Sequence, residues 1–577
     1  MSGYFKINMR FYFLLFFIVV ALTGCLPNAG KPSQSADALY VNGKIWTGTS
    51  SNPWAEGLAV VEDRIVAIGS TESLLSLRGP KTDYHDLDGK FVSPGFQDSH
   101  IHIMYQAAAR VDLAGAETLT EIQERVRKFA EANPDLTWIE GFGWGYGAFP
   151  DKRPLATHLD AVVKDRPVFV ISRDGHMALA NSLAMQVAGI NNKTADPENG
   201  RIVRSSSGDL TGEFQETAAV MIRRHIPAPT SEQRYQAFLT NMNKAAAAGI
   251  TVFHEAGLNP ENMPLFERAQ DENRLLQRID IALRMVTPDE RKKVPVEKIA
   301  DHIAKAMALR NSFDGPYLRV RSIKGMLDGT IDATTAAMFE NYVGTETSGL
   351  PFWELDVLKK TVAMYDKAGF QIMLHAIGDR AISEALDSFG YAQQINGARD
   401  SRHRIEHAEM PRLSDLERFR DLGVTASTQP MFAYPDTTVL DNFTPLLGHD
   451  RAQYADNFAI WDDAGVRQVF GSDNPVMTLS ALKGMEVAVT RLTEAGTPSG
   501  GWYPEGRIGI EAALRHYTTD SAWGLHDELE RGTLEVGKFA DFVVLSHDIL
   551  EIDPTQLSET QVLRTVMGGR TTYTHNN

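Results

Sequence analysis

The stretch PGFQDSHIH, Pro94–His102, places two histidines one residue apart where a strand-like run ends. Side chains on a β-strand alternate between its two faces, so residues two apart lie on the same face. His100 and His102 can therefore point toward one ion. Two histidines alone are weak evidence, because a single histidine at a strand end is more often structural than a ligand.

From this stretch to residue 502 the chain alternates short β-branched runs with helical segments, a pattern typical of successive βα units. With the run before His100, eight strands are predicted, the other seven at 167–172, 250–254, 319–324, 370–375, 402–407, 424–428 and 468–471. Eight such units predict an α/β fold, a (β/α)8 TIM-like barrel, whose chemistry lies at the C-terminal ends of the strands.

The two ends of the chain differ from this middle part. Residues 38–93 and 503–577 contain short alternating runs broken by turn residues such as Asn42 and Gly43. They predict a small composite β-sandwich to which both termini contribute, with the barrel at 94–502. Within the barrel, the aromatic and glycine-rich segment 138–216 is longer than a simple connection and predicts an insertion that covers substrate or packs on the barrel rim.

The first 24 residues resemble a bacterial lipoprotein signal peptide. Lys6 and Arg10 precede the apolar run 11–22, which is short for a membrane span. The run ends in LTGC, similar to a lipobox, so we expect cleavage before Cys25 and lipidation of that residue. Cys25 is the only cysteine, and a buried structural cysteine is the alternative reading.

Residues 25–37 are rich in Pro, Ser, Gly and Asn, which is typical of a flexible tether. The expected location is the bacterial cell envelope, with the lipid in the membrane. In a Gram-negative host, Leu26 after the cysteine favours the outer membrane, facing the periplasm.

Composition limits the other partners. The 577 residues are 43% hydrophobic and 23% charged, as in ordinary globular proteins. The net charge of −17 disfavours a nucleic-acid partner, because phosphate backbones are bound through clustered Lys and Arg. We expect a small-molecule substrate and no nucleic acid, and a homodimer is left open.

Polar residues also stand at the ends of later predicted strands: Lys324, His375, His407 and Asp473. Imidazole and carboxylate ligands suit Zn²⁺ or a similar divalent metal. A thiolate site is excluded because Cys25 is the only cysteine. The sequence therefore indicates a metal site with one or two ions at one end of the barrel.

Six segments in fixed order carry a family resemblance: PGFQDSHIH, LHAIGDRA (374–381), RIEHAE (404–409), TQP (428–430), GSDNP (471–475) and GTLEVGKFADFVVL (532–545). Together they resemble the metal-dependent amidohydrolase superfamily, and within it the amidohydrolase-3 branch of N-substituted formamide deformylase-like and exoenzyme-regulation-like proteins. The resemblance covers nearly all of residues 38–574. It implies the barrel and composite sandwich described above.

The resemblance also implies ligand roles. His100 and His102 would bind a first metal ion, His375 and His407 a second, and Asp473 would bind the first ion and transfer protons. Lys324 matches a lysine on the fourth strand that is carboxylated in binuclear members and bridges both ions. An unmodified ammonium group has no lone pair for a metal, and an ion pair at the surface or an interface is the alternative for Lys324.

Other candidates carry weaker signals. His176 resembles a substrate-side histidine of the family, and Trp144 is a second candidate for substrate binding. His254 and Glu255 are either substrate contacts or residues that orient a ligand. We expect His403 to be structural.

The implied reaction is hydrolysis of a non-peptide C–N bond, in an amide or an N-substituted formamide, by attack of metal-bound hydroxide. Asp473 would accept the water proton and pass it to the leaving nitrogen. Lactonase, esterase, phosphoesterase or deaminase chemistry on the same metal core is an alternative. A lipid-anchored binding protein without turnover is the alternative from another class.

The substitution Cys25→Ala is expected to abolish membrane association while the soluble protein keeps its activity, because anchor and barrel are separate modules joined by a tether. The measurement is fractionation of exported protein, with inner and outer membranes separated where the host is Gram-negative. Wild-type protein found wholly in the soluble fraction after export would contradict a lipid anchor.

Overall fold

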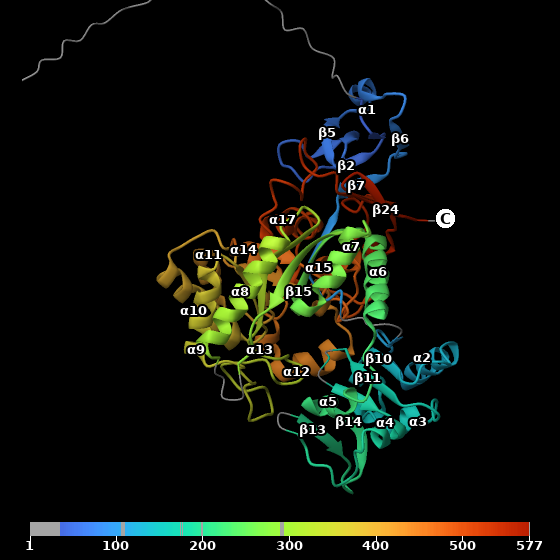
Figure 1. Ribbon diagram of the computed structural model, residues 1–577, viewed down its shortest axis with the longest axis vertical. Helices are drawn as coiled ribbons and strands as arrows, with labels where there is room; N and C mark the ends of the chain where they lie inside the picture. Colours follow the sequence, from blue (N-terminus) through green and yellow to red (C-terminus); the bar gives the residue numbers. More distant parts are fainter. Residues whose placement is uncertain are drawn as a thin grey trace, which may run out of the picture.

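The computed structural model describes residues 35–104, 110–173, 175, 177–197, 200–288 and 294–575. The expected signal peptide, Cys25 and His176 lie outside the described residues. Figure 1 shows three parts along the long axis, with the sandwich at one end, the barrel in the middle and the insertion at the other end. Within the described ranges, no helix combines the length and apolarity needed to cross a membrane.

The middle part is the predicted (β/α)8 barrel. Its eight parallel strands follow one another around a single sheet: β8 (Phe96–Ile101), β15 (Ile250–Leu258), β16 (Arg278–Arg284), β17 (Leu318–Met326), β18 (Gln371–Ala376), β19 (Arg404–His407), β20 (Thr425–Thr428) and β21 (Gln468–Phe470). The barrel closes beyond β21, where Asp473 N donates to His100 O at 2.7 Å and His102 N donates to Asn474 O at 2.8 Å.

Helices that follow the strands cover the outside of the barrel. They include α6 (Ser231–Ala247), α7 (Met263–Asp271), α8 (Val296–Ser312), α9 (Leu355–Lys367), α10 (Asp379–Asn396), α11 (Leu416–Leu422), α14 (Ala459–Asp463) and α17 (Thr519–Gly524). Their buried apolar faces pack on the outward side chains of the strands, as Phe389 of α10 and Ile405 of β19 do within one continuous apolar core.

One predicted barrel strand is wrong. Residues 167–172 form β11 (Val168–Ser172), which belongs to the sheet of the insertion, and the third barrel strand is β16. The sequence of β16, RIDIALR, contains charged residues that the structure buries in ion pairs. Arg278 contacts Asp541 at 2.7 Å, and Asp280 contacts Arg319 at 2.7 Å. These partners are distant in sequence, so the burial of β16 was not visible in its own residues.

The insertion is a separate α/β layer. Its sheet has the order β13-β14-β12-β11-β10-β9. The strands are β9 (Val111–Asp112), β10 (Ile139–Trp144), β11, β12 (Met177–Ala180), β13 (Gly200–Arg204) and β14 (Leu210–Glu216), and the helices are α2 (Leu119–Ala132), α3 (Ala156–Asp160), α4 (Ser182–Val187) and α5 (Thr217–Arg223).

The insertion begins earlier in the chain than the expected residue 138. The short strand β9 pairs with β10, and α2 packs Ile122 and Val126 into the same apolar core as β10 and β11. Its last helix, α5, adds Ile222 to a second core of the insertion. The layer therefore extends from about Val111 to Arg223.

Both termini build the sandwich. One sheet has the order β5-β4-β1-β6, and the other has the order β24-β23-β22-β7-β2-β3. The N-terminal strands are β1 (Ala38–Val41), β2 (Lys44–Trp46), β3 (Trp54–Ala55), β4 (Gly57–Val61), β5 (Arg64–Gly69), β6 (Asp83–Asp86) and β7 (Phe91–Pro94), and the C-terminal strands are β22 (Phe542–Leu545), β23 (Val562–Met567) and β24 (Arg570–Thr574). The two chain ends meet where β7 pairs with β22.

The C-terminal share of the sandwich starts later than residue 503. Helices α16 (Ile510–His516) and α17 both contact β21 of the barrel. The apolar core between the two sheets takes its C-terminal residues from Leu534 onward. Residues 503–524 therefore complete the barrel wall before the chain returns to the sandwich.

Candidate metal centre

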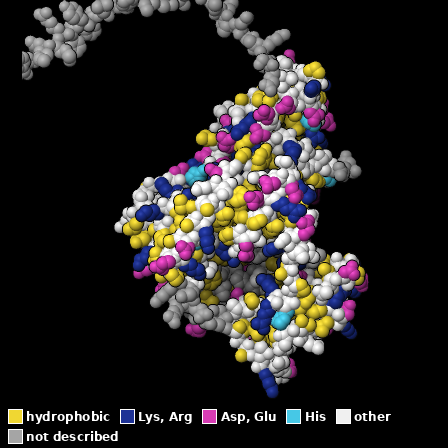
Figure 2. All heavy atoms as spheres, viewed as in Figure 1, with side chains coloured by type: hydrophobic (Ala, Val, Ile, Leu, Met, Phe, Trp, Pro, Cys, Tyr) yellow, Lys and Arg dark blue, Asp and Glu magenta, His cyan; other side chains and the backbone are white. Residues whose placement is uncertain are grey.

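A cleft opens between the mouth of the barrel and the insertion. It has a volume of about 1010 Å³, and its lining includes His102, Lys324, His375, His407 and Asp473. Figure 2 shows the surface hollowed between the barrel and the insertion. The cleft lies at the C-terminal ends of the barrel strands, where barrels of this type carry their chemistry.

His100, His102 and Asp473 form the tightest group at this mouth. One ligand atom from each lies within 4.8 Å of the others. His102 Nε2 is 3.1 Å and His100 Nε2 is 3.4 Å from Asp473 Oδ1. Within the described part of the chain, neither His100 Nε2 nor Asp473 Oδ1 has a hydrogen-bond partner, although both atoms are buried.

The ligand atoms of these three side chains suit a divalent metal ion. Burial lowers the pKa of His100 well below its ordinary value, so the imidazole is neutral and keeps a lone pair. Two imidazole nitrogens and one carboxylate oxygen are common ligands of Zn²⁺. Buried polar atoms without partners are costly, and an ion between these three side chains would satisfy them.

His375, His407 and Lys324 lie beside this group. The ring centres of His375 and His407 are 4.5 Å apart, and those of His100 and His407 are 4.9 Å apart. Lys324 is on β17, which pairs with β18, the strand that carries His375. The side chains from β8, β17, β18, β19 and the turn after β21 therefore converge, and the structure brings together all six residues of the predicted metal centre.

Lys324 has an unusual environment for a lysine. It is only 4% exposed, and burial lowers the pKa of its ammonium group to about 8. The neighbouring carboxylates of Glu406 and Asp473 oppose that shift. At pH 7 a group with this pKa is neutral in about one molecule in ten, against fewer than one in a thousand for an ordinary lysine.

The backbone is strained at two of these positions. His407 and Ala408 have φ angles of 70° and 48°, and Asp473 has a φ of 54°. This left-handed region is rarely adopted by residues other than glycine and costs about 1–3 kcal/mol each at strained sites. On β19 the side chains of Arg404 and Glu406 face the barrel interior, so alternation alone would turn His407 outward. The left-handed backbone at His407 instead brings its side chain to the mouth of the barrel, beside the other histidines.

Two acceptors that the sequence analysis missed hold the histidine rings. Gln429 Oε1 lies 2.8 Å from His407 Nδ1, and Glu406 Oε2 lies 2.5 Å from His100 Nδ1. Both residues are fully buried. Both residues stand in the quoted segments RIEHAE and TQP, Glu406 within β19 and Gln429 directly after β20.

His254 and Glu255 do not reach the cleft. His254 Nδ1 accepts from Arg404 at 3.1 Å inside the barrel. Glu255 accepts from the backbone N of Ile103 at 2.7 Å and so fixes the chain just after His102. Burial raises the pKa of Glu255 to about 8. Of the two roles considered for this pair, the structure supports orientation of the site over substrate contact.

The remaining candidates lie elsewhere. Trp144 is wholly buried in the apolar core of the insertion, where its Nε1 donates to Val170 O at 3.1 Å, so it does not line the cleft. His403 stacks on Phe389 and contacts Asp366 at 3.1 Å, against helices α9 and α10 at the far end of β19. His403 therefore has the structural position expected for it.

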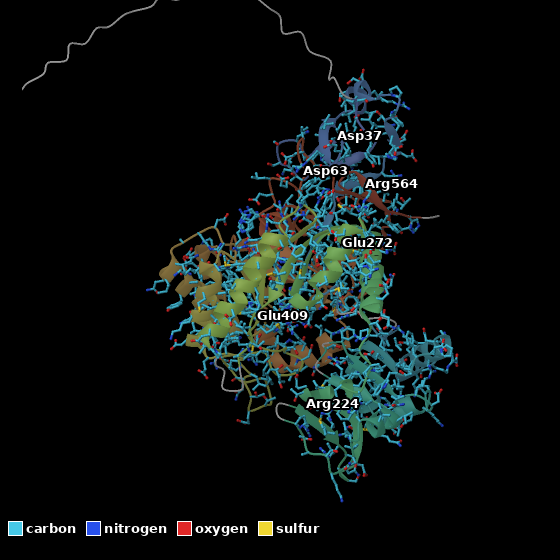
Figure 3. All side chains as sticks on the ribbon, in the orientation of Figure 1. Asp37, Asp63, Arg224, Glu272, Glu409 and Arg564 are labelled. Atoms are coloured by element: carbon cyan, nitrogen blue, oxygen red, sulfur yellow. The ribbon has the colours of Figure 1, made fainter. Side chains whose placement is uncertain are left out.

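Glu409 is a further cleft residue without a predicted role. It lies at the mouth of the barrel, across from the part of the insertion that carries Arg224 (Figure 3). Burial and the nearby carboxyl group of Asp456 raise the pKa of Glu409 well above its ordinary value. It therefore presents a carboxyl group that resists ionisation to the cleft.

Known proteins resemble the chain over nearly its full length. The protein LONG AFTER FAR-RED 3 of Arabidopsis thaliana is 30% identical over 549 residues, which cover 93% of this chain and 92% of that protein. The N-substituted formamide deformylase of Arthrobacter pascens is 26% identical over 560 residues, with 94% and 99% covered. The crystal structure of an uncharacterised metal-dependent hydrolase from Pyrococcus furiosus has a TM-score of 0.68 and 25% identity, with 89% and 100% covered.

The family model described as "Amidohydrolase family" matches residues 83–573, which include the whole barrel, the insertion and the C-terminal strands of the sandwich. The match agrees with the observed fold and with the histidine and aspartate side chains that converge at the barrel mouth. The chain belongs to the amidohydrolase family and is a hydrolase of the metal-dependent type.

Proposed function

We propose that this hydrolase cleaves a non-peptide C–N bond, in an amide or an N-substituted formamide. The observation that carries the proposal is the convergence of His100, His102 and Asp473 at the cleft, where His100 Nε2 and Asp473 Oδ1 are buried without a hydrogen-bond partner among the described residues. The name of the formamide deformylase relative supports the choice of bond.

In this proposal His100, His102 and Asp473 would hold a first divalent ion, His375 and His407 would hold a second, and a carboxylated Lys324 would serve both. Zinc is the ion proposed, because imidazole and carboxylate groups are common zinc ligands. Such ions lower the pKa of a water molecule toward neutrality and polarise a carbonyl group.

Asp473 also transfers a proton during the reaction. Its Oδ1 lies 3.1 Å from His102 Nε2, at the floor of the cleft, where it can accept a proton from the attacking water. It then donates that proton to the leaving nitrogen, because an amine leaves readily only when protonated. The amide is cleaved to a carboxylic acid and an amine, with one water consumed.

The cleft also favours a substrate with an apolar substituent. The insertion contributes Phe142 and Ile171, and the segment after β20 contributes Phe432, Val439 and Phe443. Apolar and aromatic walls of this kind bind apolar groups by excluding water. We therefore place the N-substituent between the insertion and the segment after β20, and the reacting carbonyl at the histidines.

The substrate proposal is tested with zinc-loaded protein and a panel of N-substituted formamides, other amides, lactones, esters and phosphoesters. We expect kcat/KM to be highest for the formamides and amides and to rise with the apolar area of the N-substituent, by about tenfold for each 1.4 kcal/mol of added binding. His100→Ala protein serves as the matched blank. Turnover of lactones or esters alone would support the alternative chemistry, and metal binding without any turnover would support a binding protein.

Substitution of His100 or His102 should cause loss of the first metal ion. His100→Ala or His102→Ala is expected to lower catalysis by at least about a hundredfold, with loss of bound zinc measured by elemental analysis, because each removes one ligand. His403→Ala is the matched control, since that ring packs at the other end of β19 and should cost stability more than zinc content. Zinc loss in the His403→Ala protein, with zinc retained in the His100→Ala and His102→Ala proteins, would show that His403 and not His407 is the metal ligand at β19 and that the assignment is wrong.

The Lys324 proposal includes a covalent step. The neutral Nζ attacks the carbon of carbon dioxide, an N–C bond forms, and loss of one N–H proton leaves a carbamate with a charge of −1. Two divalent ions repel each other, since even unit charges ~4 Å apart interact by about 4 kcal/mol at an effective dielectric of 20. A bridging anion offsets this repulsion.

Lys324→Ala should therefore lose the second metal ion more readily than the first, and a short-chain carboxylic acid should partly restore activity by occupying the bridge. The Lys324→Arg protein should stay inactive, because the guanidinium group stays protonated and cannot form a carbamate. Metal content and activity are measured together. An Lys324→Arg protein with full activity and two ions would favour a one-metal site of His100, His102 and Asp473.

A further inference from the structure

A charged layer lies inside the barrel directly beneath the His100–His102–Asp473 group. Arg404 and Glu406, both 0% exposed, form a two-point ion pair with Nε–Oε1 at 2.8 Å and Nη2–Oε2 at 3.0 Å. Arg404 also donates to Ser99 O, Ser427 Oγ and His254 Nδ1 at 2.7, 2.7 and 3.1 Å. The guanidinium is therefore fixed from several sides, and it fixes the carboxylate in turn.

The second oxygen of Glu406 faces His100. Glu406 Oε2 accepts from Ser427 Oγ at 2.7 Å and lies 2.5 Å from His100 Nδ1. A carboxylate paired with arginine accepts hydrogen bonds and does not donate them. The hydrogen of a neutral His100 ring must therefore sit on Nδ1, which leaves the lone pair on Nε2.

Nε2 is the atom that faces the predicted metal position. It lies 3.4 Å from Asp473 Oδ1 and has no hydrogen-bond partner among the residues that the structure describes. We propose that Glu406, held in place by Arg404, is a positioning residue that keeps the His100 Nε2 lone pair directed at the metal and so strengthens metal binding. This inference rests on the metal site of the proposed function.

His407 offers an internal comparison. Its Nδ1 is held by the neutral amide oxygen of Gln429 at 2.8 Å. A carboxylate acceptor makes a stronger, charge-assisted hydrogen bond and increases the basicity of the ligating nitrogen. The two histidines are thus oriented by acceptors of different strength, and the stronger acceptor serves the first metal position.

The test is the zinc affinity of Glu406→Gln, measured by competition with a chromogenic chelator. Glutamine keeps the shape of the side chain but replaces one accepting oxygen by an NH₂ group, so Arg404 and His100 compete for a single oxygen. We expect zinc binding to weaken by about 10- to 100-fold. Activity should return when zinc is added in excess, which a purely structural defect would not allow.

Asp366→Asn is the matched control. Asp366 contacts another buried histidine, His403, which directly precedes β19, at 3.1 Å on the side of the helices. This substitution also removes a carboxylate from a buried histidine, and it should lower the thermal midpoint without changing zinc affinity.

Wild-type zinc affinity in a folded Glu406→Gln protein would overturn the positioning role, even if His100→Ala loses its zinc. Absence of zinc from the wild-type protein would instead overturn the proposed metal site itself. If Glu406→Gln does not fold, Ser427→Ala removes one hydrogen bond to Glu406 Oε2 and should weaken zinc binding to a smaller, measurable extent. Unchanged affinity in a folded Ser427→Ala protein would then count against the proposal.

Discussion

The closure of the barrel between its first and last strands is the constraint on which the candidate site depends. Two backbone hydrogen bonds, Asp473 N to His100 O and His102 N to Asn474 O, join the ends of β8 and β21. Gly471 permits this approach, because a Cβ at that position would lie 2.6 Å from His100 N. Closure therefore brings the aspartate of the last strand to the histidines of the first, and the other candidate ligands follow from the strands between them.

The interior of this barrel is polar beneath the site, and Arg404, Glu406 and Asp98 have buried partners there. Arg404 pairs with Glu406, and Asp98 accepts from Ser472 N at 2.9 Å and from its hydroxyl at 2.5 Å. Burial raises the pKa of Asp98 to about 7. Buried ion pairs contribute little net stability compared with apolar packing. The buried polar contacts orient the side chains and the backbone at the predicted metal position. The apolar core outside the strands supplies most of the stabilisation.

The insertion and the barrel share the walls of the cleft. Arg173 of the insertion contacts Asp436 at 2.5 Å, and the other oxygen of Asp436 accepts from Thr438 N and Val439 N, at the start of a helical turn whose residues line the cleft. The ion pair therefore links the insertion to that wall. The described chain starts in the sandwich, at the opposite end of the molecule from the insertion (Figure 1).

The sequence by itself determined the fold class and the composite sandwich, because strand alternation and strand ends are local properties that a chain displays in order. It also predicted the six residues of the metal centre, from the polar residues at strand ends and from the family resemblance. Only the tertiary structure identified β16 as a barrel strand, β11 as part of the insertion, and Glu406 and Gln429 as the acceptors that orient His100 and His407. A charged residue such as Asp280 or Glu406 is as compatible with a solvated surface as with the interior. Its burial depends on an arginine or a histidine from another strand, and that pairing exists only once the barrel has closed.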